Sequence, residues 1–413
     1  MILLGVFLIL IFLYSLVSER ALKTIITAPI VFTTAGLILA FSLPELSKVQ
    51  VENKTILVIG EIALAVVLFA DATRISLSKV RRESQLPGRL LGIGMPLIIV
   101  AGTVAAILIF TEFSLWEAAI LATILAPTDA SLGTAVVNSK RVPARIRQAL
   151  NVESGLNDGL SVPLLMLFIA LARVESPSQD TSWIIYTAQQ IGFGLLVGVA
   201  VGYLGSWLVR RSDQRGWITK GAQQLALLSL ALLSWWLAEK VLPGNGFIAA
   251  FTAGVVVRLG FENAKERMIE FNEAWGDLLI YFVFYFFGML AAGDLLDISL
   301  PMWAYAILSL TLVRMLPVGL AMIRSKLHIS SVLFLGWFGP RGLSSIVLGL
   351  IFLAEKAHLA GESLIIMTVV ATVLLSVFAH GISSAPAIDV YARQMEKLPP
   401  EALERQEKEV TEF

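Results

Sequence analysis

The stretch Ile120-Leu-Ala-Thr-Ile-Leu-Ala-Pro-Thr-Asp129 places a proline and a carboxylate in the middle of an apolar run. A second stretch, Leu333-Phe-Leu-Gly-Trp-Phe-Gly-Pro-Arg-Gly342, repeats this arrangement with an arginine. Proline removes a backbone donor and clashes with the preceding turn, and the glycines weaken the helix further. Non-helical backbone and charge are tolerated at mid-membrane only where protein or water surrounds them. We therefore expect two broken helices inside a membrane protein.

The composition of the whole chain agrees with a membrane protein. Of 413 residues, 57% are hydrophobic and 15% are charged, and the mean hydropathy is +0.81. A soluble protein carries about 25% charged residues. The formal net charge of zero does not suggest a nucleic-acid partner, and the absence of cysteine excludes disulfides and thiolate metal sites. The three histidines are far apart in the sequence, and we expect no cofactor.

Apolar segments of the length that crosses a bilayer, about 20 residues, predict an all-α polytopic protein. Thirteen candidate spans lie at roughly 1–18, 24–42, 55–73, 89–110, 115–138, 146–172, 182–209, 221–241, 246–260, 271–293, 301–323, 330–355 and 361–388. The first segment has neither a basic start nor a cleavage site, so we expect it to be a retained span and not a signal peptide.

The loops between these segments predict the orientation. With the amino terminus outside, the inner loops and the tail hold 24 basic residues, and the outer loops hold five. Such a bias follows the positive-inside rule. We expect a multi-pass protein of the cell (inner) membrane, with the carboxyl terminus in the cytoplasm and a short cytoplasmic tail at 391–413.

The two broken spans suggest an inverted repeat. They occupy the fifth position of each six-span block if the seventh span is a connector, and the two blocks then enter the membrane from opposite sides. At their crossing, Asp129 can face the positive end of a half-helix, and Arg341 can balance negative ends. The less favoured alternative is a proline kink with side chains that reach the membrane surface.

The sixth span carries two polar stripes within Asn151-Val-Glu-Ser-Gly-Leu-Asn-Asp-Gly159 and the turn after it. Ser154, Asp158 and Ser161 share one helical face, and Glu153 and Asn157 lie beside them. Oxygen ligands without sulfur or imidazole suit a hard cation. This pattern predicts a cation site that faces a cavity or a charged partner.

Asp158 is our candidate carrier, because one carboxylate that binds either a proton or a cation is sufficient for exchange. Thr128, in the unwound segment, and Ser154 are candidate neutral ligands.

Glu153 is the candidate partner of Arg341, and Asn157 is expected to hydrogen-bond within that pair. We favour a charge-neutralising role for Glu153 over direct cation binding. The sequence does not choose a role for Glu61, Asp277 or Arg314.

The runs Ala126-Pro-Thr-Asp129 and Glu153-Ser-Gly-Leu-Asn-Asp158 resemble the NhaP/NHE branch of the monovalent cation–proton antiporters. Phe69-Ala-Asp-Ala72 and Gly339-Pro-Arg-Gly342 are similar to other signature stretches of that family. The resemblance extends from the first span to about residue 390. It implies thirteen transmembrane helices in an NhaA-like fold with two inverted six-helix repeats.

The resemblance also implies that residues 1–390 form a transmembrane antiporter domain with a core part and a dimerisation part. Core spans would lie at about 89–172 and 301–388, and dimerisation spans at about 1–73 and 182–293. A homodimer in the lipid bilayer would work by alternating access, with an elevator-like movement of the core.

At the level of residues, the resemblance implies an ion and proton site and a supporting set around it. The ion and proton site would contain Asp158, Ser154, Thr128, Asp129 and Asp71, with the monovalent cation on Asp158, Ser154 and Thr128. The supporting, charge-compensating set would contain Glu153, Asn157 and Arg341, with Glu153 and Arg341 as a pair. Asp71 matches the family loosely; it could line a cytoplasmic funnel or cap a helix end.

The predicted function is electroneutral antiport of one Na⁺ (or Li⁺) for one H⁺, the stoichiometry being implied by Asn157 next to Asp158. The alternative within the class is K⁺/H⁺ antiport; a cation channel is less favoured because no filter segment is evident. We expect no enzymatic activity, because the chain shows no nucleophile elbow or matching base.

Overall fold

The structure is a computed structural model. It describes residues 2–21, 26–42, 54–74, 85–174, 182–261, 267, 276–355, 358–399 and 402–405. Within these ranges the chain forms helices and no strand. The predicted all-α class is therefore confirmed.

The described helices occur in the following order along the chain. In the first half they are α1 (Ile2–Ala21), α2 (Ala28–Ser42), α4 (Lys54–Arg74), α6 (Gln85–Arg89), the π-helical turn η1 (Leu90–Gly94), α7 (Met95–Ile109), α8 (Leu115–Ile124), α9 (Ala130–Val137) and α10 (Ala144–Val174). In the second half they are α11 (Ser182–Gln214), α12 (Lys220–Trp236), the π-helical turn η2 (Leu237–Val241), α13 (Gly246–Gly260), α15 (Asp277–Asp294), α16 (Leu300–Leu310), α17 (Leu312–Ala321), α18 (Ile329–Trp337), α19 (Leu343–Ala354) and α20 (Glu362–Glu396).

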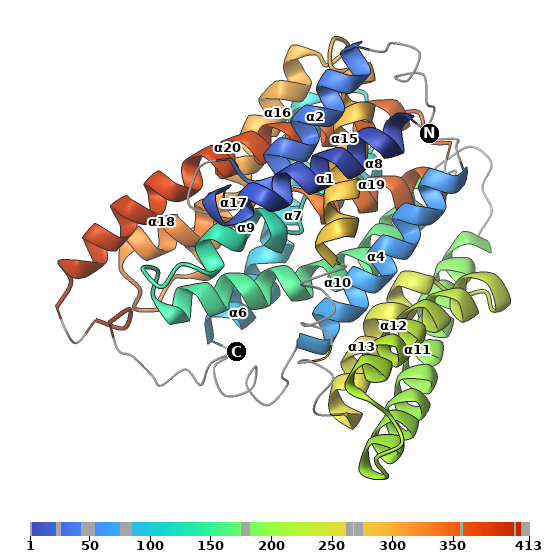
Figure 1. The fold of residues 1–413 in the computed structure, drawn as a ribbon. Coiled ribbons are helices and arrows are strands. Elements are labelled where there is room, and N and C mark those ends of the chain that lie inside the picture. Colours follow the sequence, from blue (N-terminus) through green and yellow to red (C-terminus); the bar gives the residue numbers. More distant parts are fainter. Residues whose placement is uncertain are drawn as a thin grey trace.

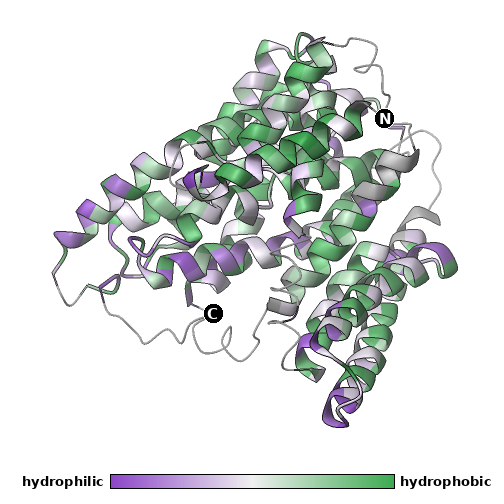
Figure 2. Ribbon diagram, in the orientation of Figure 1, coloured by the Kyte–Doolittle hydropathy of each residue, from purple (hydrophilic) through white to green (hydrophobic). Residues whose placement is uncertain are grey.

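The lengths and hydropathy of these helices suit a bilayer. Six helical segments of the described chain are long and apolar enough to cross a membrane, and seven further apolar helices have 10–17 residues. Figure 2 shows apolar residues along the middle of the helices and hydrophilic residues gathered toward several helix ends. The predicted fifth and twelfth apolar segments each fall on two short helices, α8 with α9 and α18 with α19.

The helices pack in three groups (Figure 1). One group contains α4, α11 and α12, which all pack on α13. A second group contains α7 to α10 and α16 to α20, with both pairs of short helices. The third group consists of α1, α2 and α15, which packs closely along α2. The long helix α10 joins the first two groups, because it contacts α8 and α9 on one side and α4, α11 and α13 on another.

Three glycines spaced by four residues bring α11 against α13. A Cβ atom added at Gly194, Gly198 or Gly202 would lie 2.7–2.9 Å from a backbone oxygen of α13 or of its N-cap, Asn245. Small residues at this spacing let two membrane helices approach closely and gain dispersion contacts. The α11–α13 pair is therefore one of the tightest crossings in the protein.

Both predicted helix breaks are present. The first lies between α8 and α9, where Pro127 and Thr128 are non-helical and Asp129 is the extended N-cap of α9. The second lies between α18 and α19, over 338–342. The two unwound segments are in contact, since the N–H of Asp129 donates to the carbonyl of Pro340 at 2.8 Å. This contact places the chemistry of both breaks in one site.

Candidate functional site

Asp129 links the start of α9 to the start of α19. Its Oδ1 accepts from the N–H and the hydroxyl of Ser131, at 2.7 and 2.6 Å. Its Oδ2 accepts from the N–H of Leu343 at 2.6 Å. One carboxylate therefore caps two helix N-termini, where the helix dipole favours a negative charge. The prediction that Asp129 faces a positive half-helix end is confirmed, for both half-helices.

Gly342 makes this double cap possible. A Cβ atom at residue 342 would overlap Oδ2 of Asp129. The glycine is therefore required for the close approach of the carboxylate, in addition to its effect on helix stability.

Arg341 serves the opposite kind of helix end. Its Nη1 donates to the carbonyls of Ala126 and Pro127, at 2.6 and 2.8 Å, at the carboxyl-terminal end of α8. The side chain is fully buried. The prediction that Arg341 balances a negative half-helix end is confirmed for α8.

His380, on α20, meets the remaining half-helix end. Its Nε2 lies 2.9 Å from the carbonyl of Trp337, the last residue of α18. Its Nδ1 lies 3.1 Å from the hydroxyl of Ser376, which in turn accepts from the N–H of Arg341 at 2.7 Å. A neutral ring protonated on Nε2 satisfies this chain of contacts. All four ends of the two broken helices thus have a polar partner.

The expected pair of Glu153 with Arg341 is wrong. Glu153 instead forms a bidentate ion pair with Arg314 on α17: Nη1 to Oε1 is 2.5 Å and Nη2 to Oε2 is 2.8 Å. Both side chains are at most 3% exposed. The planar guanidinium fork of Arg314 matches the carboxylate, whereas Nη1 of Arg341 donates to backbone carbonyls. The expected charge-neutralising role of Glu153 remains a prediction, now with Arg314 as the partner.

Gly339 provides the space for Arg314. A Cβ atom at residue 339 would overlap Nε of that arginine. Both glycines of the second break therefore admit a charged side chain from another helix.

Asn157 also differs from the expectation, because it does not bind within the arginine–glutamate pair. Its Nδ2 donates to Oγ1 of Thr128 at 2.8 Å. The amide thereby ties α10 to the unwound segment after α8. Thr128 remains within the site, with its hydroxyl oxygen held toward α10.

Asp158 binds the first turn of α19. The hydroxyl of Ser344 donates to Oδ2 of Asp158 at 2.6 Å, and both side chains are buried. Leu343, the neighbour of Ser344, is the residue that binds Asp129. Consecutive residues of α19 therefore hold the two aspartates of the site.

A small pocket lies next to this arrangement. Three predicted ligands, Thr128, Asp129 and Ser154, contribute to its lining; the other lining residues are Gly133, Val136, Val137, Leu150, Phe338 and Pro340. Asp158 follows Ser154 by one helical turn and so lies on the same face of α10. The hydroxyl of Ser154 donates to the carbonyl of Leu150 at 3.0 Å, which leaves the lone pairs of its oxygen as potential cation ligands.

Asp71 lies on α4, but its side chain is outside the described residues. Asp277 accepts from the hydroxyl of Tyr281 at 3.4 Å. Glu61 lies near the charges of Lys240 and Glu239.

Sequence reasoning missed the roles of four residues of this site. Arg314 was visible as a charge within an apolar span, but no pattern indicated its partner. Ser344, Ser376 and His380 lie in apolar helices and became site residues only through the crossing of the broken helices.

The chain is similar to several known proteins. Residues 6–389 match the family described as "Sodium/hydrogen exchanger, transmembrane". The chain is 26% identical over 359 residues to a protein named K(+)/H(+) antiporter NhaP2 from Shewanella sp. (strain ANA-3), covering 85% of this chain and 60% of that protein. It is 27% identical over 251 residues to Na(+)/H(+) antiporter 2 from Zygosaccharomyces rouxii, covering 57% of this chain and 31% of that protein. The chain thus spans about 60% of the length of the first of these relatives.

The fold is similar to a solved structure. The sodium proton antiporter MjNhaP1 from Methanocaldococcus jannaschii, determined at pH 8, superposes with a TM-score of 0.73 at 21% sequence identity. The match covers 92% of this chain and 99% of that one.

Proposed function

Because this chain belongs to the sodium/hydrogen exchanger family, we propose that it is an antiporter that exchanges a monovalent cation, sodium in the first instance, for a proton. The observation that supports this most directly is the position of Asp158. Its carboxylate is bound by Ser344 and follows Ser154, a lining residue of the pocket, by one turn.

The chemistry of the pocket suits a hard, singly charged cation. Thr128, Asp129 and Ser154 supply hydroxyl and carboxylate oxygens, which are ligands that such cations prefer. The other nearby charges already have partners: Arg314 binds Glu153, and Arg341 binds backbone carbonyls. A cation bound at Asp158 therefore need not compete with a buried arginine for its carboxylate.

Exchange follows from the use of one carboxylate for two ligands. When Asp158 is ionised, the Ser344 hydroxyl donates to it, and a cation can bind the remaining oxygen lone pairs. When Asp158 is protonated, the same hydroxyl can rotate and accept a hydrogen bond from the carboxylic acid. Ser344 thus satisfies both forms, and the proton and the cation exclude each other.

We propose a stoichiometry of one proton per cation. Position 157, next to the carrier, holds an amide whose NH₂ group is used to bind Thr128. An amide does not titrate, so Asp158 alone would carry the proton. One half-cycle would then carry one cation across the membrane, and the other would carry one proton in the opposite direction.

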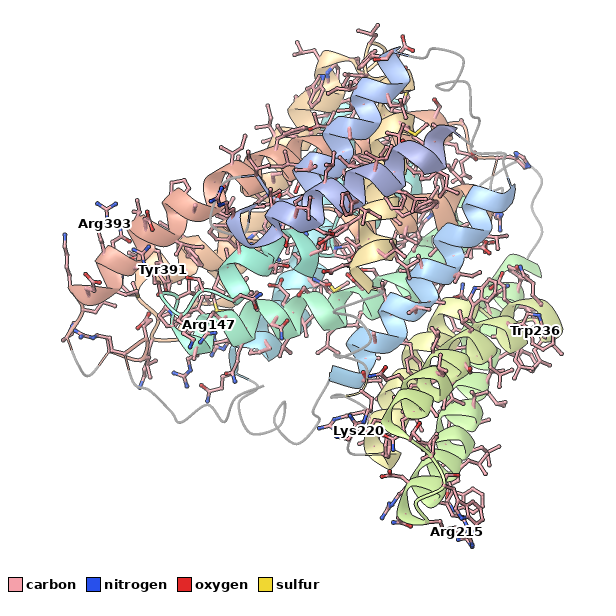
Figure 3. All side chains as sticks on the ribbon, in the orientation of Figure 1. Arg147, Arg215, Lys220, Trp236, Tyr391 and Arg393 are labelled. Carbon is pink, nitrogen blue, oxygen red and sulfur yellow. The ribbon has the colours of Figure 1, made fainter. Side chains whose placement is uncertain are left out.

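We propose that the amino terminus lies outside the cell and the carboxyl terminus in the cytoplasm. Figure 3 supports this orientation, because Arg215 and Lys220 lie toward the lower end of the α11–α12 group, and Trp236 lies toward its other end. Arg147 and Arg393 lie on the left side of this view. Val136 and Val137, at the end of α9, line the pocket, and Nη1 of Arg147 donates to the carbonyl of Val137 at 3.4 Å, so the pocket would have access to the cytoplasmic side.

The proposed cycle divides the helices as the packing groups do. The broken helices with α7, α10, α16, α17 and α20 would move as the core, and α11 to α13 with the amino-terminal helices would form the dimerisation scaffold. The two breaks would belong to inverted repeats of six spans within thirteen. A homodimer would hold the scaffold still while the core alternates between the two sides.

Potassium is the second candidate cation. The name of the Shewanella relative specifies K⁺, whereas that of the yeast relative specifies Na⁺. Oxygen ligands serve either ion, so the size of the pocket and the flexibility of its ligands would decide between them.

Proton flux in proteoliposomes tests the proposal. A pH-sensitive dye inside the vesicles reports proton movement after Na⁺, K⁺ or Li⁺ is added outside. We expect cation-dependent proton movement in the wild type and none above empty vesicles for Asp158→Asn. Asp389→Asn, which alters an exposed carboxylate paired with Arg141, is the matched control and should retain activity.

The stoichiometry is tested by clamping the membrane potential with valinomycin and potassium. An electroneutral exchange keeps the same rate at each clamped potential. A rate that follows the potential contradicts the 1:1 proposal, and full activity of Asp158→Asn contradicts the role of the carrier. Cation flux without proton movement would indicate a channel instead of an antiporter.

A further inference from the structure

The residue that follows the proposed carrier is in close contact with α13. A Cβ atom added at Gly159 would overlap three ring carbons of Phe251, the atoms Cδ2, Cε2 and Cζ. The aromatic ring therefore packs directly on the glycine backbone of α10. A glycine inside a helix costs up to about 1 kcal/mol relative to alanine, so its presence here requires a compensating reason, which this contact supplies.

Phe251 projects from a helix that is held on two other sides. Toward α11, Gly198 and Gly202 bring the backbones close together at Ala249 and Ala253. Toward α4, a Cβ atom at Gly254 would lie 2.5 Å from the carbonyl of Phe69. Because α13 packs closely on α4 and α11 at these small residues, the ring of Phe251 is attached to the group of α4, α11 and α13.

The ring and the pocket contact α10 on different sides of the carrier along the chain. The pocket reaches Leu150 and Ser154, which precede Asp158, whereas the ring covers Gly159, which follows it. On the proposed orientation, the part of α10 after Asp158 leads to the outer face. A path for water past Gly159 would connect the carrier to both sides of the membrane at once.

We propose that Phe251, seated on Gly159, is a seal. It keeps water and protons of the outer side from reaching Asp158 while the pocket faces the inner side. The inference rests on the proposed function and adds to it a residue that determines coupling. An aromatic ring in a narrow passage excludes water, as hydrophobic constrictions do in channels. The flat, side-chain-free surface of Gly159 lets α10 slide beneath the ring when the core moves.

Two substitutions test this role. Phe251→Ala removes the seal, so vesicles with this variant should lose an imposed pH gradient about tenfold faster than wild-type vesicles in buffer without Na⁺, K⁺ or Li⁺. Phe251→Leu keeps an apolar side chain of similar reach and should retain a tight membrane. Phe282→Ala is the matched control, because Phe282 packs on Phe7, in the group of α1, α2 and α15, and should not increase the leak.

Gly159→Ala tests the same contact from the side of α10. The added methyl group overpacks the ring, so the maximal exchange rate should fall roughly fivefold, while the apparent KM for the cation changes less than about twofold. In the double variant Gly159→Ala/Phe251→Ala, the steric conflict is removed, and the rate should recover although the leak persists. Thermal unfolding of the purified variants verifies that each one is folded.

The outcomes separate this inference from the proposed function. Wild-type protein without cation–proton exchange overturns the proposed function. If the wild type exchanges ions and vesicles with Phe251→Ala hold the pH gradient as long as wild-type vesicles, the proposal that Phe251 is a seal is overturned. Additive effects of the two substitutions on the exchange rate also overturn it, because Gly159 and Phe251 would then act independently.

Discussion

The hydroxyl of Ser344 donates a 2.6 Å hydrogen bond to Oδ2 of Asp158. The donor lies in the first turn of α19, immediately after the second helix break, and the acceptor lies in α10. This bond connects the proposed carrier to the half-helix whose first N–H, that of Leu343, donates to Asp129. Binding at Asp158 is thereby coupled to the geometry of the crossing.

Ser344→Ala should weaken cation binding. The substitution removes the donor that positions the Asp158 carboxylate, at a cost of about 1–2 kcal/mol, or roughly 5- to 30-fold in affinity. The apparent KM for the cation in proteoliposomes at fixed pH measures this effect.

Ser345→Ala is the control for that change. Ser345 is equally buried, and its hydroxyl has no hydrogen-bond partner among the residues that the structure describes. We expect its KM to stay within about twofold of the wild type, since no hydrogen bond of that size is lost. Equal KM values for the two alanine variants would contradict a positioning role for Ser344.

Glu153→Ala should destabilise the protein strongly, because it leaves the buried Arg314 without its counter-charge. Breaking a buried ion pair at one partner costs about 3–5 kcal/mol, whereas replacing both partners by apolar residues costs much less. We therefore expect the double variant Glu153→Leu/Arg314→Leu to unfold at a higher temperature than Glu153→Ala. Thermal unfolding in detergent checks the order of the three proteins.

The exposed pair of Arg141 and Asp389 offers a contrast to this buried one. Arg141→Ala should lower the free energy of unfolding by less than about 1 kcal/mol, as is usual for surface ion pairs. If Glu153→Ala were no less stable than Arg141→Ala, the pair with Arg314 would have no structural importance.

Asp129→Ala should destabilise the crossing of the broken helices. It removes an N-cap from α9 and leaves the N–H of Leu343 without its acceptor, which together cost about 2–3 kcal/mol. Asp129→Asn keeps one acceptor oxygen and should lose less. Thr219→Ala, which removes a single exposed N-cap from α12, is the control and should cost at most about 1 kcal/mol. An unfolding temperature of Asp129→Ala equal to that of Thr219→Ala would contradict the double cap.

The apparent KM for the cation should depend on pH in the manner of simple competition. While most carriers are protonated, each unit of increase in pH lowers the proton concentration tenfold, and the KM should fall by about the same factor. Above that range the site is ionised and the KM should become constant. Initial exchange rates at a series of pH values measure this curve. A KM that rises with pH would show that the proton and the cation do not compete for Asp158.

Much of the site was predictable, because proline and charged residues are energetically unfavourable in an apolar helix and therefore mark special positions in the sequence. Proline and charge in the runs around Asp129 and Arg341 indicated broken helices, and the structure places both breaks where they were expected. The helix dipole predicted that the aspartate would meet helix N-termini and the arginine a carboxyl-terminal end, which is confirmed. These outcomes depend on backbone chemistry within a few residues.

Pairings between residues far apart in the chain were less predictable from the sequence. The expected pairing of Glu153 with Arg341 was wrong, because two arginines lie near one glutamate and only the three-dimensional crossing decides which of them reaches it. The sequence provides the number of charges but not their distances. For the same reason, the glycines at 339 and 342 were read as helix breakers, and their role in admitting Arg314 and Asp129 was not seen.

The sequence by itself determined that the chain is all-helical and apolar, where two of its helices break, and which carboxylates lie within apolar segments. It could do so because periodicity, proline chemistry and the cost of charge in lipid act within a single segment. Only the tertiary structure decided that Ser344 binds Asp158, that Arg314 pairs with Glu153, and that Phe251 covers Gly159. Those contacts join helices far apart in the chain, and the packing of whole helices sets their distances.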